Sequence, residues 1–457
     1  MASDRHAVVW TRCGTAPLKM GTLTVTDTQC RFTYAAEFLT TSLPGLGILY
    51  APAFIGGNTI AWDRTAYFNL LPQLQFHIPP EGEANFQRRL VLSYLEQQGR
   101  KPRAGFDSDW AILTTAGHGG IGHLDVFESD DKASAWYADK TTPALFAITD
   151  SIGFSLKDFL AWLDHDAQAL LAALGPTPSV GGAIPKLLLS IPSTGWDGRI
   201  SLPSKGISEG RIDVVLKFEK DNYRGIVELE ALTLDLHAQA GFDVPRHWIA
   251  AINGIPALAI ERFDRDATGR PLFMETAYAL MASGDARITN HYSSSYDAIG
   301  RAFDRSPIPI VADPKLTKLQ LIKRLLLAFV TGNGDLHLEN LSFLQRDHQI
   351  GWSPVYDPTP MRAYSRHNML AVMPFGNYGE PGKAGMTTSF AAALLQLAKG
   401  FGFRKNILRD LIEETLGVTQ DYAARVDALQ ALPADNKALL IQITNKIRTQ
   451  LERFSLG

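Results

Sequence analysis

The sequence predicts an α+β fold with two lobes, one rich in strands and one all-helical, preceded by a small β-rich domain. Short β-type runs separated by glycine turns fill the first 128 residues and return after residue 179, whereas helical periodicity dominates beyond about residue 270. A chain of 457 residues is long enough for about three domains. We therefore expect domains at 1–128, 129–265 and 266–457, with a ligand cleft between the last two.

The composition is that of a folded globular protein, with 46% hydrophobic and 20% charged residues. A formal net charge of −3 argues against a protein that binds nucleic acid by itself, so such a contact would be local or made through a partner. Cys13 and Cys30 are too few for a disulfide framework or a zinc site. No signal peptide and no apolar run of about 18 residues is apparent, so we expect a cytoplasmic protein without a membrane segment.

The N-terminal domain is predicted from three strand-like runs, AVVW, GTLTV and RFTY, followed by a helical stretch, ANFQRRLVLSYLEQQG. It ends in HGGIGHLDVF, where a glycine turn leads into a strand. The polar segment at 128–142, ESDDKASAWYADKTT, is predicted to be a linker. The periodic run at 155–175 is predicted to be a helix that ends at Gly175.

The strand-rich lobe is predicted from the strands KLLLSI, DVVLKF and ALAIERF, with the helix-like VELEALTLDLHAQAG between the second and third. The helical lobe is predicted from three runs with helical spacing, LTKLQLIKRLLLAFV, FAAALLQLAKG and NKALLIQITNKIRTQL. Charged motifs lie close to the junction of these two halves, as expected for a site in a cleft.

The segment at 179–186, SVGGAIPK, is a candidate phosphate-binding loop. Its two glycines let the backbone approach a phosphate closely and turn N–H groups toward it. An ordinary glycine hairpin explains the same residues. Pro185 has no N–H, so the loop offers a phosphate one contact fewer at that position.

Lys217 lies in the apolar strand VVLKF, so its ammonium faces either water or a cleft. Glu230 follows on the helix-like segment, with Glu228 as an alternative. A strand lysine paired with a helix glutamate orients the α- and β-phosphates of ATP in kinase-like sites. A solvated surface position explains each of these residues when it is taken alone.

The dodecapeptide at 332–343, GNGDLHLENLSF, is a candidate catalytic loop for phosphoryl transfer. Asp335 and Asn340 have the D-x-x-x-x-N spacing of kinase catalytic loops, in which the aspartate accepts or orients a hydroxyl proton. Asn340 and Asp357, which follows a short predicted hairpin, offer the oxygen ligands that Mg²⁺ prefers. With no histidine or cysteine nearby in the sequence, His337 is expected to hold the loop by hydrogen bonds rather than to bind a metal.

At these residues the chain resembles the HipA family of bacterial toxin serine/threonine kinases. The resemblance rests on SVGGAIPK, PALAIERFDR and GNGDLHLENLSF followed by YDP, and on FNLLPQ and HGGIGHLDVF in the N-terminal block. It implies a bilobal protein-kinase-like core that binds ATP and Mg²⁺. It also implies autophosphorylation at Ser179, which would add about two negative charges and could pull the loop away from ATP.

The resemblance implies particular roles for the remaining site residues. Asp335 would be the catalytic base, with Lys217 and Glu230 in the catalytic site, and Asn340 and Asp357 would bind the metal. The nucleotide site would comprise the glycine loop, the hinge and the catalytic loop, namely Val180, Gly181, Gly182, Ala183, Lys186, Lys217, Glu261, Arg262, Phe263, His337, Asn340 and Asp357.

The implied function is that of a toxin kinase that phosphorylates a translation factor such as an aminoacyl-tRNA synthetase, which would arrest growth and favour persistence. The implied partner is a helix-turn-helix antitoxin of the HipB type, through which the chain would reach DNA indirectly. Two alternatives stay open. A small-molecule kinase of the aminoglycoside phosphotransferase type shares GDLH…N, although the N-terminal block has no obvious place in such enzymes. An inactive co-repressor that binds a DNA-binding partner is the other.

Overall fold

The computed structural model describes residues 4–81, 85–140, 145–147, 184, 186–203, 209–252, 255–367, 369–379 and 389–456. The chain forms two compact units, one made of Met1–Phe218 with His247–Glu275 and the other of Glu219–Arg246 with Thr276–Gly457. The predicted helix at 155–175 and residues 179–183 of the glycine loop lie outside the described residues. The three-domain division stays a prediction.

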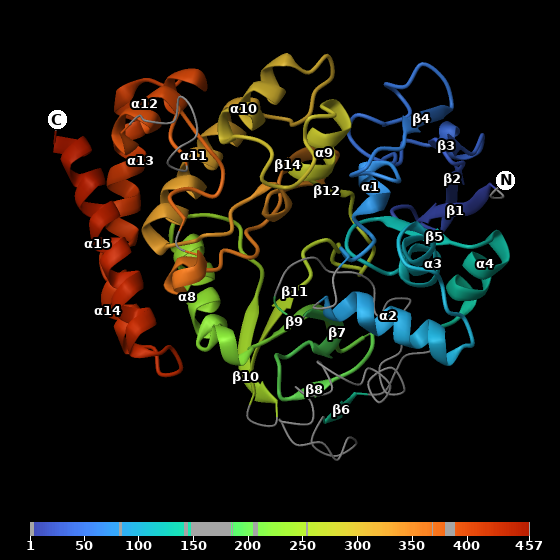
Figure 1. Ribbon diagram of the computed structural model, residues 1–457, viewed down its shortest axis with the longest axis horizontal. Helices are drawn as coiled ribbons and strands as arrows, with labels where there is room; N and C mark the ends of the chain where they lie inside the picture. Colours follow the sequence, from blue (N-terminus) through green and yellow to red (C-terminus); the bar gives the residue numbers. More distant parts are fainter. Residues whose placement is uncertain are drawn as a thin grey trace. The chain divides into compact units, whose positions relative to one another are not determined.

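The first unit contains a five-stranded antiparallel sheet with the order β4-β3-β2-β1-β5 (Figure 1). Its first three strands contain the three runs predicted from the sequence. Alternate side chains, such as Ala7 and Val9, enter a core that also holds Val91 and Leu95 of one helix and Ile112 of the next. The elements are β1 Arg5–Thr11, β2 Leu18–Val25, β3 Gln29–Tyr34, β4 Thr59–Asp63, β5 Leu124–Phe127, α1 Pro72–Gln75, α2 Phe86–Gln97 and α3 Phe106–Ala116.

Residues 130–138 form a helix, α4 Asp130–Ala138, so the prediction of a linker is wrong there. The Ser129 side chain caps this helix by accepting the N–H of Lys132 over 3.3 Å. Ala133 and Tyr137, one turn apart, are buried against Phe127 of β5. Most residues of the segment are polar because they lie on the exposed face of the helix. The two buried residues are too few to give a recognisable helical pattern.

A second antiparallel sheet in the same unit has the order β10-β11-β9-β7. One face of it forms a core with Leu187, Leu189, Val214 and Leu216, onto which Leu90 of α2 packs. Helix α2 therefore contributes to both cores of the unit. The strands are β7 Lys186–Pro192, β9 Arg211–Phe218, β10 His247–Ile252 and β11 Ile255–Glu261, and a short pair is formed by β6 Phe146–Ala147 and β8 Arg199–Ile200.

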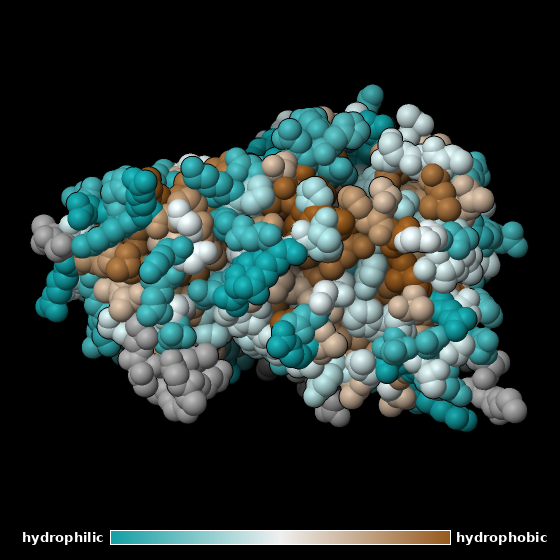
Figure 2. All heavy atoms as spheres, turned by 90° about the horizontal axis from the view of Figure 1, so that it is seen from above, coloured by the Kyte–Doolittle hydropathy of each residue, from teal (hydrophilic) through white to brown (hydrophobic). Residues whose placement is uncertain are grey.

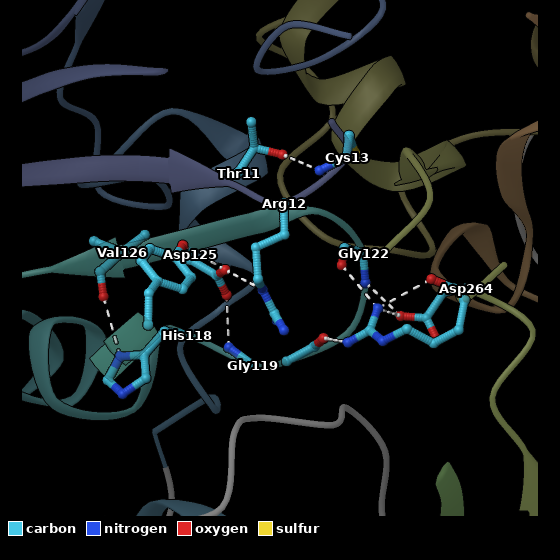
Figure 3. Close-up of polar contacts among 12 residues, drawn as sticks. Thr11, Arg12, Cys13, His118, Gly119, Gly122, Asp125, Val126 and Asp264 are labelled. Atoms are coloured by element: carbon cyan, nitrogen blue, oxygen red, sulfur yellow. Dashed lines mark hydrogen bonds and ion pairs between the residues drawn. The ribbon is translucent and has the colours of Figure 1, made fainter. Parts of the chain in front are cut away.

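A buried charge network joins the segment after β11 to the glycine turn before β5 (Figure 3). Arg262 donates to both oxygens of Asp264 over 3.0 and 2.8 Å, and Arg265 donates to the same carboxylate over 2.8 Å. Both guanidinium groups also donate to the carbonyl of Gly120, over 2.5 and 2.9 Å. Asp264 in turn accepts the N–H of Gly122 over 2.8 Å. The stretches ERFDR and HGGIGH, far apart in the sequence, thus form one structure.

Asp125 of β5 fixes the other end of the glycine turn (Figure 3). Its carboxylate accepts the N–H of Gly119 over 2.6 Å, the Nε–H of Arg12 over 2.9 Å and the hydroxyl of Tyr137 over 2.8 Å. Burial alone would raise the pKa of Asp125, but Arg12 and these hydrogen bonds outweigh burial and hold the pKa below its usual value. The turn is therefore held by an ionised carboxylate at each end.

The described part of the second unit is mainly helical and includes a hairpin formed by β13 and β14, as the sequence predicted ahead of Asp357. Helix α11 begins with Asp313, whose side chain accepts the N–H of Leu316 over 2.9 Å, and has Pro314 in its first turn. The elements are α8 Ile226–Gln239, α9 Ala277–Gly284, α10 Tyr296–Arg305, α11 Pro314–Thr331, β13 Ser342–Arg346, β14 Gln349–Trp352, α12 Phe390–Gly400, α13 Lys405–Val418, α14 Tyr422–Ala428 and α15 Ala434–Leu456.

Within the described part of the chain, no helix has the length and apolar character needed to cross a membrane. On the face shown in Figure 2, hydrophilic side chains dominate, and hydrophobic ones gather in smaller areas between them. Isolated apolar side chains are normal on a protein surface. Among the residues that the structure describes, the large exposed ones are Leu39, Phe54, Tyr67, Ile249, Tyr292, Leu316 and Leu395.

We predict that Asp264→Asn lowers the stability of the first unit by about 3 kcal/mol, because two buried guanidinium groups would lose their shared counter-charge. Asp266→Asn is the matched control, since Asp266 lies two residues away and its bonds to Thr268 and Arg270 are on the surface. Calorimetry should show a clearly lower unfolding temperature for Asp264→Asn alone. Equal unfolding temperatures for the two variants would contradict the assigned role of the network.

Candidate functional site

The candidate catalytic loop starts where α11 ends. Gly332 adopts a left-handed conformation with φ 72°, and a Cβ there would lie 2.4 Å from Leu440. Glycine is therefore required to turn the chain at this point. The next residue, Asn333, is buried and its side chain accepts the N–H of Asp335 over 2.8 Å. The Gly-Asn-Gly approach thus fixes the main chain of Asp335.

Asp335 is held by two side chains of its own loop. The Nδ2 of Asn340 donates to the Asp335 carbonyl over 2.7 Å and to its carboxylate over 3.2 Å. The Nε2 of His337 lies 3.3 Å from the other carboxylate oxygen of Asp335. The Nδ1 of His337 accepts the N–H of Glu339 over 3.2 Å, so the ring proton lies on Nε2. His337 thus holds the loop by this hydrogen bond, and its Nε2 lies near the carboxylate of Asp335.

Buried and half-buried side chains support the loop through its carbonyl groups. Tyr296 donates to the carbonyl of Leu336 over 2.6 Å, and Tyr356 donates to that of Glu339 over 2.5 Å. Arg324 donates to the carbonyl of Asn340 over 3.3 Å. Burial lowers the pKa of Arg324 to about 10, which still leaves the guanidinium charged at neutral pH. The loop is therefore supported by two tyrosine hydroxyls and one charged guanidinium.

Asp357 is half-buried and follows the β13–β14 hairpin in a left-handed conformation with φ 48°. Such a conformation is uncommon for a residue with a side chain, and it persists where surrounding contacts impose it. The main chain just before it is fixed by the bond from Val355 N–H to the carbonyl of Asp243, 2.9 Å. Asp357 is therefore a candidate functional residue by its conformation as well as by its place in the sequence.

The two candidate glutamates of α8 have different surroundings. Glu230 is buried and accepts the hydroxyl of Thr359, two residues after Asp357, over 3.3 Å. Glu228 accepts the N–H of Ala431 over 3.1 Å, in the connection between α14 and α15. Of the two residues, Glu230 is therefore the one that contacts the segment of Asp357.

Lys186 and Lys217 occupy the face of the second sheet opposite its core. They are direct partners across the antiparallel pair β7–β9, and both are buried, with 5% and 3% exposure. Leu188 and Leu258, also buried, lie on the same face by strand alternation. The pairing therefore places two cationic side chains next to each other on this face. The expected site residues Lys186 and Lys217 are thus brought together.

The hinge residues 261–263 continue from β11. The N–H of Arg262 donates to the carbonyl of Asp213 over 2.9 Å, and its guanidinium belongs to the network around Asp264. Any contact of this hinge with a base would therefore use backbone groups of Glu261 and Phe263.

Sequence reasoning missed the neighbours of His337. The ring of His291 lies 4.2 Å from that of His337, and its Nδ1 lies 3.2 Å from the Glu339 carboxylate. The expectation of no nearby histidine is thus wrong, and no spacing in the sequence signals this contact. His291, His337 and Glu339 have ligand atoms within 4.8 Å of one another. However, metal-bound histidines donate their other ring N–H, whereas His337 Nδ1 accepts one, so a metal ion here is disfavoured.

The residues of the candidate site belong to different units. Asp335, His337, Asn340, Asp357 and Glu230 lie in the helical unit, where the first three contact one another. Lys186, Lys217 and the hinge lie in the strand-rich unit. Ser179, Val180, Gly181, Gly182 and Ala183 lie outside the described residues.

Comparisons of the sequence with known proteins agree on one family. The sequence model of the HipA-like C-terminal domain family matches residues 178–422, more than half of the chain. A putative kinase of Haemophilus influenzae is 25% identical over 295 residues, which cover 59% of this chain and 80% of that protein. The serine/threonine-protein kinase toxin HipA of Shewanella oneidensis is 24% identical over 294 residues, covering 61% of this chain and 64% of that protein.

A solved structure shares the fold. The complex of the Shewanella oneidensis toxin–antitoxin system HipA, HipB and its operator DNA contains a chain similar to this one with a TM-score of 0.67. The match covers 98% of this chain and 97% of that chain at 16% identity. The predicted fold class, an α+β kinase-like core preceded by a β-rich domain, is confirmed by this likeness.

We predict that Asp357→Gly raises the unfolding temperature, because glycine adopts a positive φ without strain. The strain that a side chain causes in this conformation costs about 1 kcal/mol. Asp357→Asn is the control and should unfold close to wild type, since asparagine tolerates this conformation. A lower unfolding temperature for Asp357→Gly than for Asp357→Asn would show that side-chain contacts outweigh the strain.

Proposed function

Because the chain belongs to the HipA-like C-terminal domain family, we propose that it is an ATP- and Mg²⁺-dependent serine/threonine protein kinase. The names of its relatives, a putative kinase and a serine/threonine-protein kinase toxin, support this proposal. The observation that supports it most directly is the loop in which Asn340 and His337 both bind the carboxylate of Asp335.

Asp335 would serve as the catalytic base toward a serine or threonine hydroxyl. Its side chain is 37% exposed, so a substrate hydroxyl can reach it. A hydrogen bond from Asn340 to one carboxylate oxygen and the His337 ring beside the other set its orientation. The hydroxyl proton would pass to Asp335 as the hydroxyl oxygen attacks the γ-phosphoryl group.

The metal would be held by the Oδ1 of Asn340 and the carboxylate of Asp357, hard oxygen ligands that suit Mg²⁺. The amide nitrogen of Asn340 is engaged by Asp335, which leaves its oxygen as the ligand atom. When bound, the ion would neutralise charge that develops on the transferred phosphoryl group.

The nucleotide would use the lysine-bearing face of the second sheet. Lys186 and Lys217 would contact phosphates, with Glu230 as the partner that orients Lys217. The buried Leu258 suits a neighbouring base, and the backbone of Glu261 and Phe263 would form the adenine-binding hinge. The glycine-loop residues Val180, Gly181, Gly182 and Ala183 would cover the phosphates.

We propose that the kinase is the toxin of a toxin–antitoxin pair. The likeness to a HipA chain solved with HipB and operator DNA supports a HipB-type antitoxin partner, through which the chain would reach DNA. A translation factor such as an aminoacyl-tRNA synthetase would be the target. Phosphorylation of Ser179 in the glycine loop would switch the kinase off.

The test of the activity is the Asp335→Asn variant with labelled ATP and Mg²⁺. Loss of the base should reduce phosphoryl transfer at least about 100-fold without lowering the unfolding temperature. Asp347→Asn, in the exposed turn between β13 and β14, is the control and should transfer normally. Transfer at a near wild-type rate by Asp335→Asn would remove that residue from its role. Turnover only with an added metabolite would favour a small-molecule kinase.

Autophosphorylation has its own test. Mass spectrometry of wild-type protein incubated with MgATP should find phosphate on Ser179, and Ser179→Ala should carry none in that peptide. The Asp335→Asn protein controls for phosphate acquired during expression. Phosphate at another residue with Ser179 unmodified would contradict the proposed regulation.

A further inference from the structure

Glu339 lies in the same loop as the proposed catalytic base, and its carboxylate contacts the His291 ring at 3.2 Å. It precedes Asn340 in a short 3-10 turn, and its side chain is 31% exposed. Its main chain is fixed on both sides, because the N–H binds His337 and the carbonyl binds the hydroxyl of Tyr356. A side chain on a fixed backbone can discriminate between ligands, since little entropy is lost on binding.

The carboxylates of Glu339 and Asp335 have only histidine as ion-pair partners among the described residues, His291 for the first and His337 for the second. Two acidic side chains therefore lie together on the surface around the proposed base. Burial and then the two carboxylates raise the pKa of Tyr292 to about 12, which indicates that this tyrosine shares their environment.

Tyr292 adds an aromatic surface to this acidic one. Its side chain is 43% exposed, although its ring packs on His337 with centroids 5.2 Å apart and planes at 83°. It also lies against the ring of His291, which binds Glu339, at 4.2 Å. An exposed aromatic ring beside a carboxylate suits the side chain of arginine or lysine. The carboxylate binds the cation by charge, and the ring binds it by a cation–π contact.

We propose that Glu339 and Tyr292 select protein substrates that carry a lysine or arginine close to the phosphorylated serine or threonine. This proposal rests on the protein-kinase function proposed above and adds a preference for positive charge next to the phosphorylated residue. Glu339 and Tyr292 act as specificity residues and His291 as a positioning residue for Glu339. None of the three takes part in phosphoryl transfer.

The experiment measures kcat/KM of the full-length protein on serine peptides that carry lysine, glutamine or glutamate at each flanking position. Wild type should prefer lysine over glutamine about fivefold at one position, as expected for one partly solvated charge pair. Glu339→Gln should abolish the preference, and Glu339→Lys should shift it to glutamate. Tyr292→Ala should weaken the preference, whereas Tyr292→Phe should keep it because the ring remains.

Two controls separate substrate choice from other effects. Glu452→Gln removes an exposed glutamate of α15 and should leave the preference unchanged. Binding of a fluorescent ATP analogue with Mg²⁺ should be equal in all variants.

Phosphorylation of peptides without a charge preference, or a preference that survives in Glu339→Gln, would overturn the inference and leave the kinase function standing. A weaker Mg²⁺ dependence with an unchanged preference would instead assign Glu339 to the metal site. Normal ATP binding without transfer to any peptide would overturn both proposals.

Discussion

The hydrogen bonds from the Asn340 side-chain amide to Asp335 are the interaction on which the proposed site depends. One amide group donates to both the carbonyl and the carboxylate of Asp335, over 2.7 and 3.2 Å. It thereby orients the proposed base and leaves its own oxygen for a metal. The buried Tyr296 and the half-buried Tyr356 bind carbonyl groups of the loop, so the proposed base and the proposed metal ligand are held by one turn.

Buried charge serves two different purposes in this chain. Around Asp264, one carboxylate and two guanidinium groups are bound to one another and to the glycine turn, so the network stabilises the first unit. Lys186 and Lys217 instead place like charges opposite each other on two strands. Stability explains the first network, whereas the second is the pair to which we assign the proposed binding of phosphates.

Features with a local signal were predictable from the sequence. The strands around Lys217 followed from their apolar runs, and the contact of Asp335 with Asn340 followed from a spacing of five residues. Helix α4 was missed because an exposed polar face masks its two buried residues. The contacts of His291 with the catalytic loop, and of Arg262 with the glycine turn, join distant segments, and tertiary packing alone determines them. The sequence predicted that Asp357 follows a hairpin, but nothing in the sequence predicts its positive φ.

A crystal structure of the full-length protein with Mg²⁺ and a non-hydrolysable ATP analogue tests the central claim most directly. The account predicts one metal ion bound by Asn340 Oδ1 and the Asp357 carboxylate, with Lys217 on the phosphates and Asp335 facing the γ-phosphoryl group. A nucleotide bound elsewhere, or a metal ion that contacts neither Asn340 nor Asp357, would contradict it.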